Sequence, residues 1–185
     1  MHAQLQIILD DLAAARERWQ KLVRDTPDPR WHQRRDPSQW SVAENIAHLN
    51  LSARAMQPLL DDAAFRAKAL GSIGAAKMKP ALFGRMLAKM VGPVPRVLGF
   101  AMGRVKTTTP FVPGGAQPRL EVSAEFERHL AAHQKSIRAA DGLPLDQVKI
   151  ESPFVKGAHY DGLSGWAIVV RHIHRHLDQA ERIWG

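Results

Sequence analysis

Apolar residues recur at helical spacing in four long stretches of the chain, with charged and polar residues between them. An apolar residue at every third or fourth position places one face of a helix against a core. The four stretches are residues 3–24, 41–60, 121–140 and 164–184. Because little strand-like alternation accompanies them, the pattern predicts an all-α fold in which four helices pack as a bundle.

Two of these helices carry a start signal. Ser41 and Glu44 form an S-x-x-E capping box, in which the serine caps the Glu44 amide and the glutamate reaches back. Ser164 is expected to be the N-cap of the last helix. The stretch Thr26–Pro37 contains three prolines and is predicted to be a loop, and a short strand is expected at Val148–Ile150.

A long basic connection separates the second and third helices. Residues 71–118 contain glycines that dilute any long helix, so only short helices are expected, at 80–91 and 94–104. The interval 63–120 carries ten basic residues and no acidic one, whereas the rest of the chain has 16 basic and 18 acidic residues. This segment is either a solvated insertion or a local positive field that attracts phosphates, carboxylates or anionic lipid.

The composition narrows the class of protein. A length of 185 residues is that of one domain, taken as residues 1–185. The absence of cysteine excludes disulfides, zinc–thiolate sites and cysteine nucleophiles. The first residues include acids where a signal peptide needs an apolar stretch, and we expect a cytoplasmic protein. No helix-turn-helix, zinc-finger or aromatic RNA-binding signature is present, so nucleic acid is not an expected partner.

Two H-x-x-x-H pairs are candidates for binding a metal ion. Residues four apart lie on one face of a helix, so His172 and His176, or His129 and His133, can face one ion. With His48 from the second helix, three neutral imidazoles would hold a divalent metal and leave coordination positions open. His133 falls within the apolar stripe of its helix, as a core histidine, a cavity-lining residue or a ligand. The H-E-x-x-H signature of zinc peptidases is absent.

Two motifs together resemble the DinB-like (DinB/YfiT) superfamily. They are W-S-V-A-E-N-I-A-H-L at 40–49 and R-H-I-H-R-H-L-D-Q at 171–179, and the resemblance covers most of the chain. It implies a four-helix bundle that binds a metal near one end, with His48, His172 and His176 as its ligands. Residues 71–118 are then an insertion longer and more basic than the minimal family pattern.

Several neighbours of these histidines are expected to support the site. Asn45 faces inward beside His48, and Gln179 lies on the ligand side of the last helix, where it can orient His176. His133 is expected to line the cavity without binding the metal. Glu44 is explained by helix capping, and Trp40 is expected to be a packing residue.

The resemblance implies a metal-dependent enzyme, because characterised members of the superfamily include transferases and isomerases that use low-molecular-weight thiols. The expected cofactor is a divalent metal ion, zinc or nickel, and the expected partners are a small, anionic substrate and a thiol cosubstrate. One alternative is a metal-dependent hydrolase. Another is a non-catalytic bundle that binds an anionic partner or a membrane surface through residues 63–120, although a membrane is less expected. A homodimer is left open.

The insertion is expected to fold over the bundle as a lid near the metal. Its apolar residues would dock it, and Arg85 and Lys89 would bind an anionic substrate or thiol. The docking residues are expected to include Leu82, Phe83, Met86, Leu87, Val97, Leu98 and Phe100.

Overall fold

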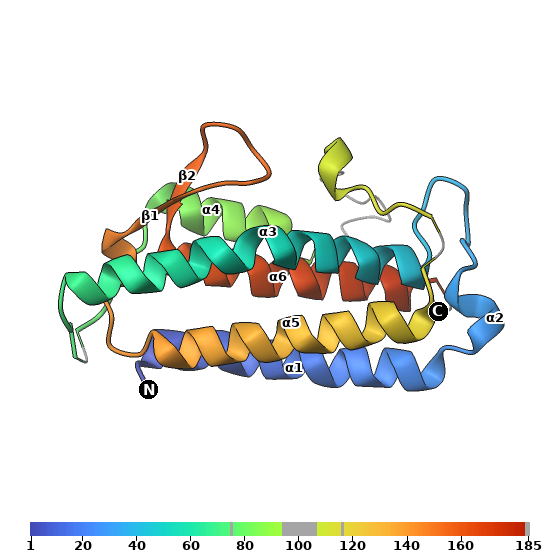
Figure 1. Ribbon diagram of the computed structural model, residues 1–185, viewed down its shortest axis with the longest axis horizontal. Helices are drawn as coiled ribbons and strands as arrows, with labels where there is room; N and C mark the ends of the chain where they lie inside the picture. The colour runs from blue at the N-terminus through green and yellow to red at the C-terminus, as the bar shows by residue number, and fades with distance from the viewer. Residues whose placement is uncertain (75, 94–106, 116, 184–185) are drawn as a thin grey trace, which may run out of the picture.

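Four long helices run along the longest axis of the protein, as Figure 1 shows for the computed structural model. The structure describes residues 1–74, 76–93, 107–115 and 117–183. The elements in chain order are α1 (Ala3–Asp25), α2 (Asp28–Trp31), α3 (Val42–Ala69), α4 (Leu82–Val91), the 3-10 turn η1 (Thr109–Phe111), α5 (Arg119–Ala139), η2 (Leu145–Gln147), β1 (Lys149–Glu151), β2 (His159–Asp161) and α6 (Gly162–Glu181). The predicted all-α fold is confirmed.

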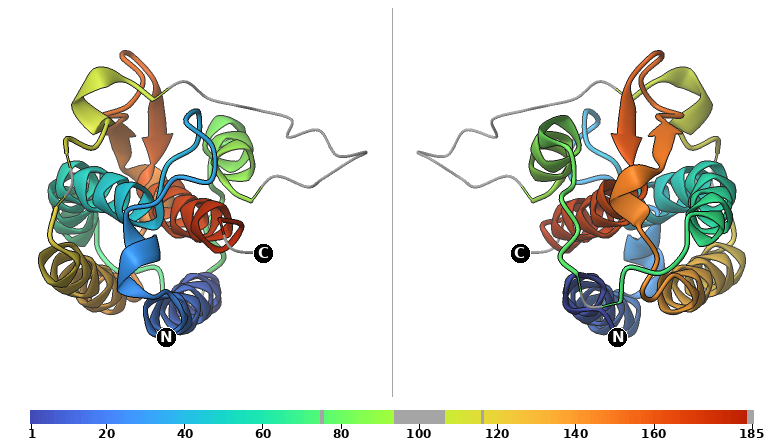
Figure 2. Two further views of the ribbon diagram at one scale, coloured as in Figure 1. Left: turned by 90° about the vertical axis from the view of Figure 1, so that its right-hand side faces the viewer. Right: turned by 90° about the vertical axis from the view of Figure 1, so that its left-hand side faces the viewer.

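The four long helices form a closed ring of neighbours. α1 contacts α5 and α6, and α3 contacts the same two helices, so that α1 and α3 lie diagonally opposite (Figure 2). The apolar stripes predicted from the sequence face the inside of this ring and are buried. Its largest buried side chains include Trp19, which packs edge-on against Trp31 and Phe126 at ring distances of 6.1 and 5.0 Å.

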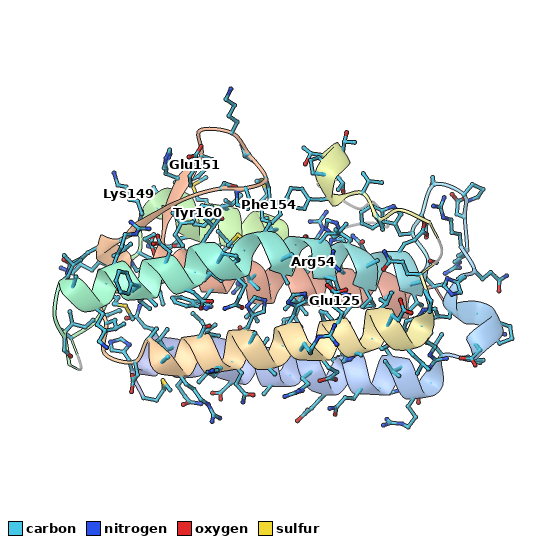
Figure 3. All side chains as sticks on the ribbon, in the orientation of Figure 1. Arg54, Glu125, Lys149, Glu151, Phe154 and Tyr160 are labelled. Carbon is cyan, nitrogen blue, oxygen red and sulfur yellow. The ribbon has the colours of Figure 1, made fainter. Side chains whose placement is uncertain are left out.

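α3 and α5 run in the same direction. Asn50 of α3 donates to the Val122 carbonyl, and Gln57 donates to Ser136 further along both helices. Between these two contacts, Arg54 pairs with Glu125, as Figure 3 shows. Parallel neighbours need a connection that travels back along the bundle, which explains why the chain between these helices is long. α4 belongs to that connection and packs on the outside of α6.

α4 docks through its small residues. Gly84 and Ala88 are buried against α6, and a Cβ atom added to Gly84 would lie only 2.4 Å from the Ser164 hydroxyl. The prediction that the large apolar residues dock the segment is wrong for Leu82, Phe83 and Met86, which are half or more exposed, because close helix packing selects the glycine face. Leu87 is partly buried. Val97, Leu98, Phe100 and the helix expected at 94–104 lie outside the described residues.

Two local predictions need correction, and a third is confirmed. The N-cap of α6 is Asp161, not Ser164: its carboxylate accepts from both the Ser164 amide and the Ser164 hydroxyl at 2.8 Å. The proline-rich stretch after α1 includes one helical turn, α2, because proline fits the first turn of a helix. The short strand expected at Val148–Ile150 is present as β1, and it pairs with β2, a strand that the sequence did not indicate.

Among the described residues, no helix is both long and apolar enough to cross a membrane.

Candidate metal centre

The three predicted ligands come from two helices that pack side by side. His48 lies two turns after the start of α3, and the predicted capping box at that start is confirmed: Ser41 Oγ accepts from the Glu44 amide, and Glu44 accepts from the Ser41 amide. His172 and His176 lie one turn apart on α6, which packs against α3. The structure therefore brings together residues separated by more than 120 positions in the sequence.

The Nε2 atoms of the three histidines converge. His172 Nε2 lies 3.2 Å from that of His48 and 3.1 Å from that of His176, and all three ligand atoms lie within 4.8 Å of one another. Nitrogen ligands at roughly 2.0–2.1 Å from a tetrahedral zinc ion stand about 3.3 Å apart. The spacing therefore fits a metal ion, and the group could hold one.

The other ring nitrogens fix the tautomers. His48 Nδ1 lies 2.7 Å from the Phe111 carbonyl, which can only accept, so this nitrogen carries the proton. His176 Nδ1 lies 2.9 Å from Asn45 Oδ1 and is protonated for the same reason. The Nε2 atoms of these two rings are then unprotonated, and both face His172 Nε2. If His172 Nε2 carries a proton, it can donate a hydrogen bond to only one of them, so the other lone pair has no donor. A cation resolves this conflict.

Asn45 hydrogen-bonds His176 and fixes the orientation of its ring. Its amide nitrogen donates to the carbonyls of Ser41, at 2.9 Å, and Trp40, at 3.3 Å, which turns its oxygen toward His176. The side chain is almost fully buried, so the geometry is fixed by the first turn of α3. Gln179 lines the cavity close to His176 and acts against the lowering of the His176 pKa.

Burial keeps all three imidazoles neutral. It lowers the pKa of His48 in spite of the bond to Phe111, lowers that of His172 to about 3, and lowers that of His176 well below its usual value. The neighbouring histidines and Arg175 add to the shift of His172 and His176. Neutral imidazole is the form that binds metal, so the site needs no deprotonation at pH 7.

The histidines line a cavity of about 1040 Å³. Trp40 covers two of them, with its ring 4.9 Å from His48 and stacked 5.8 Å from His176. The β1–β2 hairpin contributes Tyr160 and, from its loop, Phe154, whose ring is 6.3 Å from His172. The cavity is also lined by residues of α4, α5 and α6. It is large enough for a small-molecule substrate.

The competing histidine pair also borders the cavity, as the sequence left open for His133. His129 and His133 line it from α5, but they are not part of the cluster of converging ligand atoms found among the described residues. His129 instead lies 3.2 Å from Glu125 on its own helix.

A family model of the DinB superfamily matches residues 11–180. The chain belongs to the DinB superfamily. No curated protein and no solved structure matches it. Membership agrees with the helical bundle.

Sequence reasoning missed part of this DinB-superfamily site. Trp40 was expected only to pack, yet its ring contacts His48 and His176. Its position directly before the capping box of α3 was the one feature of the sequence that could have indicated this. The Phe111 carbonyl lies at the end of the short turn η1, and a backbone carbonyl gives no signal in the sequence. Glu44 is occupied by the capping box and by an ion pair with Arg34.

The cations that line the cavity are not the ones predicted. Arg85 and Lys89 are exposed on α4 and are not among the lining residues, so their role in anion binding stays a prediction that this geometry does not favour. Arg35, Arg175 and Arg182 line the cavity instead. Arg175 is half-buried and donates to the Met90 carbonyl of α4 at 3.2 Å, and burial lowers its pKa.

Proposed function

We propose that this protein is a metal-dependent enzyme that transfers a low-molecular-weight thiol to a small electrophilic substrate, with a zinc or nickel ion held by His48, His172 and His176. The observation that carries the proposal is the convergence of three Nε2 atoms at metal-ligand spacing on the wall of a large cavity. Membership of the DinB superfamily supports it.

The ligand set suits this chemistry. When bound by three neutral imidazoles, a divalent ion keeps its full charge and acidifies a thiol or a water molecule that joins it. In the transfer, the sulfur forms a bond to the electrophilic carbon, the leaving group departs with its bonding pair, and the thiol proton passes to water. Asn45 and Phe111 hold the imidazoles in place, and Trp40 shields two of them from solvent.

The thiol must be a cosubstrate, because the chain has no cysteine. Small biological thiols often carry carboxylates. The guanidinium groups of Arg175 and Arg182 border the cavity and are suited to bind such a carboxylate, since their planar donors match its two oxygens.

The experiment compares metal-free protein with protein loaded with Zn²⁺ or Ni²⁺. The thiols are glutathione and 2-mercaptoethanol, and the electrophile is 1-chloro-2,4-dinitrobenzene. We expect a rate that requires both metal and thiol, and that survives in the His129→Ala control. Equal rates with and without metal would contradict the proposal. Metal-dependent hydrolysis of 4-nitrophenyl acetate without any thiol rate would favour the hydrolase alternative.

One observation favours a second candidate function, binding to an anionic membrane surface. α4 exposes Leu82, Phe83, Met86 and Met90, with Arg85 and Lys89 among them. An exposed apolar face flanked by basic residues is typical of helices that lie on membranes. Co-sedimentation with phosphatidylserine vesicles that is lost in an Arg85→Gln/Lys89→Gln variant, while metal chemistry is unchanged, would support this function.

A further inference from the structure

The cavity continues from the three histidines into the interior of the bundle. Its inner walls come from α3, α5 and α6 and are mainly apolar, with Leu49, Met56, Phe126, Leu130 and Ile173 among the lining residues. The proposed metal centre does not use this inner part.

Ser52 and His133 are buried polar side chains on this mainly apolar wall. Ser52 is 5% exposed and His133 is 1% exposed, and both line the cavity. Among the described residues, neither the Ser52 hydroxyl nor either ring nitrogen of His133 has a hydrogen-bond partner. A buried polar group without a partner is costly and uncommon in folded proteins. Two such groups on the wall of one cavity indicate that the cavity's contents supply their partners.

Their positions place them in order along the cavity. Ser52 lies one turn after His48 on α3 and therefore follows it on the same face. His133 lies one turn before Ser136, which bonds Gln57 and Asp61 further along α3. The wall thus passes from His48 to Ser52 and then to His133, away from the three histidines.

The polar pair is uncharged. Burial lowers the pKa of His133 to about 4, with His129 lowering it further and Asp61 opposing the shift. A neutral imidazole offers one donor and one acceptor, and a serine hydroxyl offers both. An ionised ligand group would lose its hydration here without meeting an opposite charge from this pair. A hydroxyl or carbonyl group matches the pair without that cost.

We propose that Ser52 and His133 form a second binding subsite, which takes the uncharged hydroxyl or carbonyl group of an otherwise apolar ligand lying along the inner cavity. As a statement about the substrate this rests on the proposed function, because the ligand's other end would lie at the three histidines. The subsite itself does not require the metal ion.

The test uses 1-hexanol and hexanoate as probes, with metal-free and Zn²⁺-loaded protein, and follows the histidine ring nitrogens by NMR. We expect 1-hexanol to bind both forms and shift the His133 signals, and hexanoate to shift them little, because its carboxylate is attracted to the arginines and the metal ion and not to this uncharged pair. Ser52→Ala and His133→Phe should each weaken 1-hexanol roughly three- to tenfold, the factor of one neutral hydrogen bond. Ser123→Ala is the matched control, because the Ser123 hydroxyl is also buried and unpartnered but does not line the cavity.

Three results would overturn the subsite: 1-hexanol leaves the His133 signals unshifted, hexanoate shifts the His133 signals of the metal-free protein as far as 1-hexanol does, or both variants bind 1-hexanol as the wild type does. If His133→Phe does not fold, the His133 signals of the wild-type protein and the affinity of Ser52→Ala for 1-hexanol still test the subsite. His176→Ala separates the two proposals, since it should abolish metal binding and leave 1-hexanol binding in place.

Discussion

In His48 and His176, the Nδ1 atom is hydrogen-bonded to a protein oxygen and the Nε2 atom faces His172. For His176 the bound nitrogen depends on Asn45, whose amide is itself held by two backbone carbonyls. Partners of this kind keep a ligand ring in its metal-binding orientation and tautomer.

Asn45→Ala should therefore weaken metal binding roughly 10- to 100-fold without abolishing it, as is usual when such a partner is lost. Competition with a chelator of known affinity measures the effect. Asn50→Ala is the matched control, because Asn50 is also buried on α3 but donates to Val122 of α5. An equal loss of affinity in both variants would show that helix stability, and not ring orientation, explains the result.

His133 should make stability depend on pH. Its pKa is about 4 when folded and near 6.5 when unfolded, so between these values the unfolded state binds more protons. Titration of His133 therefore leaves the free energy of unfolding unchanged above about pH 6.5. As the pH falls from there toward 4, it lowers the free energy of unfolding by up to about 3 kcal/mol. Urea unfolding of wild type and His133→Phe at pH 7, 5.5 and 4 measures this, and the variant should lose less. Parallel curves for the two proteins would contradict it.

For single residues, helical spacing alone could not select the metal ligands, because His129 and His133 have the same spacing as His172 and His176. The family motif was needed to choose His48, His172 and His176. The partner of His48 could not be predicted. Phe111 lies 63 residues away, at the end of the turn η1, and it contributes a backbone carbonyl, which no residue type identifies.

Among the elements, α4 forms part of the cavity wall through Leu87, Met90 and Val91. Its position depends on the close approach of Gly84 to α6. A Cβ atom there would lie 2.4 Å from Ser164 Oγ and 2.6 Å from Ser164 Cβ, and that hydroxyl is already bonded to Asp161.

Gly84→Ala should therefore destabilise the protein by about 1–3 kcal/mol, because overpacking outweighs alanine's better helix propensity. Urea unfolding gives the free energy, and limited proteolysis shows whether α4 is released from α6. Gly114→Ala is the control, since its added Cβ meets nothing within 4 Å. A variant more stable than wild type would show that α4 is not held in this way.

Arg175 of α6 and Arg85 of α4 are two candidates for binding the carboxylate of a thiol, and their substitution separates them. Arg175 lines the cavity from α6, whereas Arg85 is exposed on α4. Arg175→Gln should raise the KM for glutathione about tenfold, as expected for loss of a charged hydrogen bond, and should change the KM for 2-mercaptoethanol little. Arg85→Gln should alter neither. Steady-state kinetics with both thiols tests this, and the reverse ranking would restore the role first predicted for α4.

The sequence predicted the four long helices because their stripes are regular, as in α3 with its buried Ile46, Met56 and Leu60. The sequence did not predict local structure that depends on a contact between two elements. β2 is three residues long and exists through its pairing with β1. The docked face of α4 depends on Gly84, a residue that sequence rules count against a helix.

In the whole molecule, the parallel arrangement of α3 and α5 has a consequence for the site. The connection between them returns along the bundle on the side of α3 and α6, where α4 and η1 add to the cavity (Figure 2). The long basic segment thus contributes Phe111 to the histidines and three residues of α4 to the wall.

The most direct test of this account is the metal content of the protein purified without an affinity tag, measured by elemental analysis. We predict one equivalent of divalent metal per chain in the wild type and in His129→Ala, and almost none in His48→Ala, His172→Ala or His176→Ala. Stoichiometric metal that persists in all three of these variants, or that is lost in His129→Ala, would contradict the three-histidine centre.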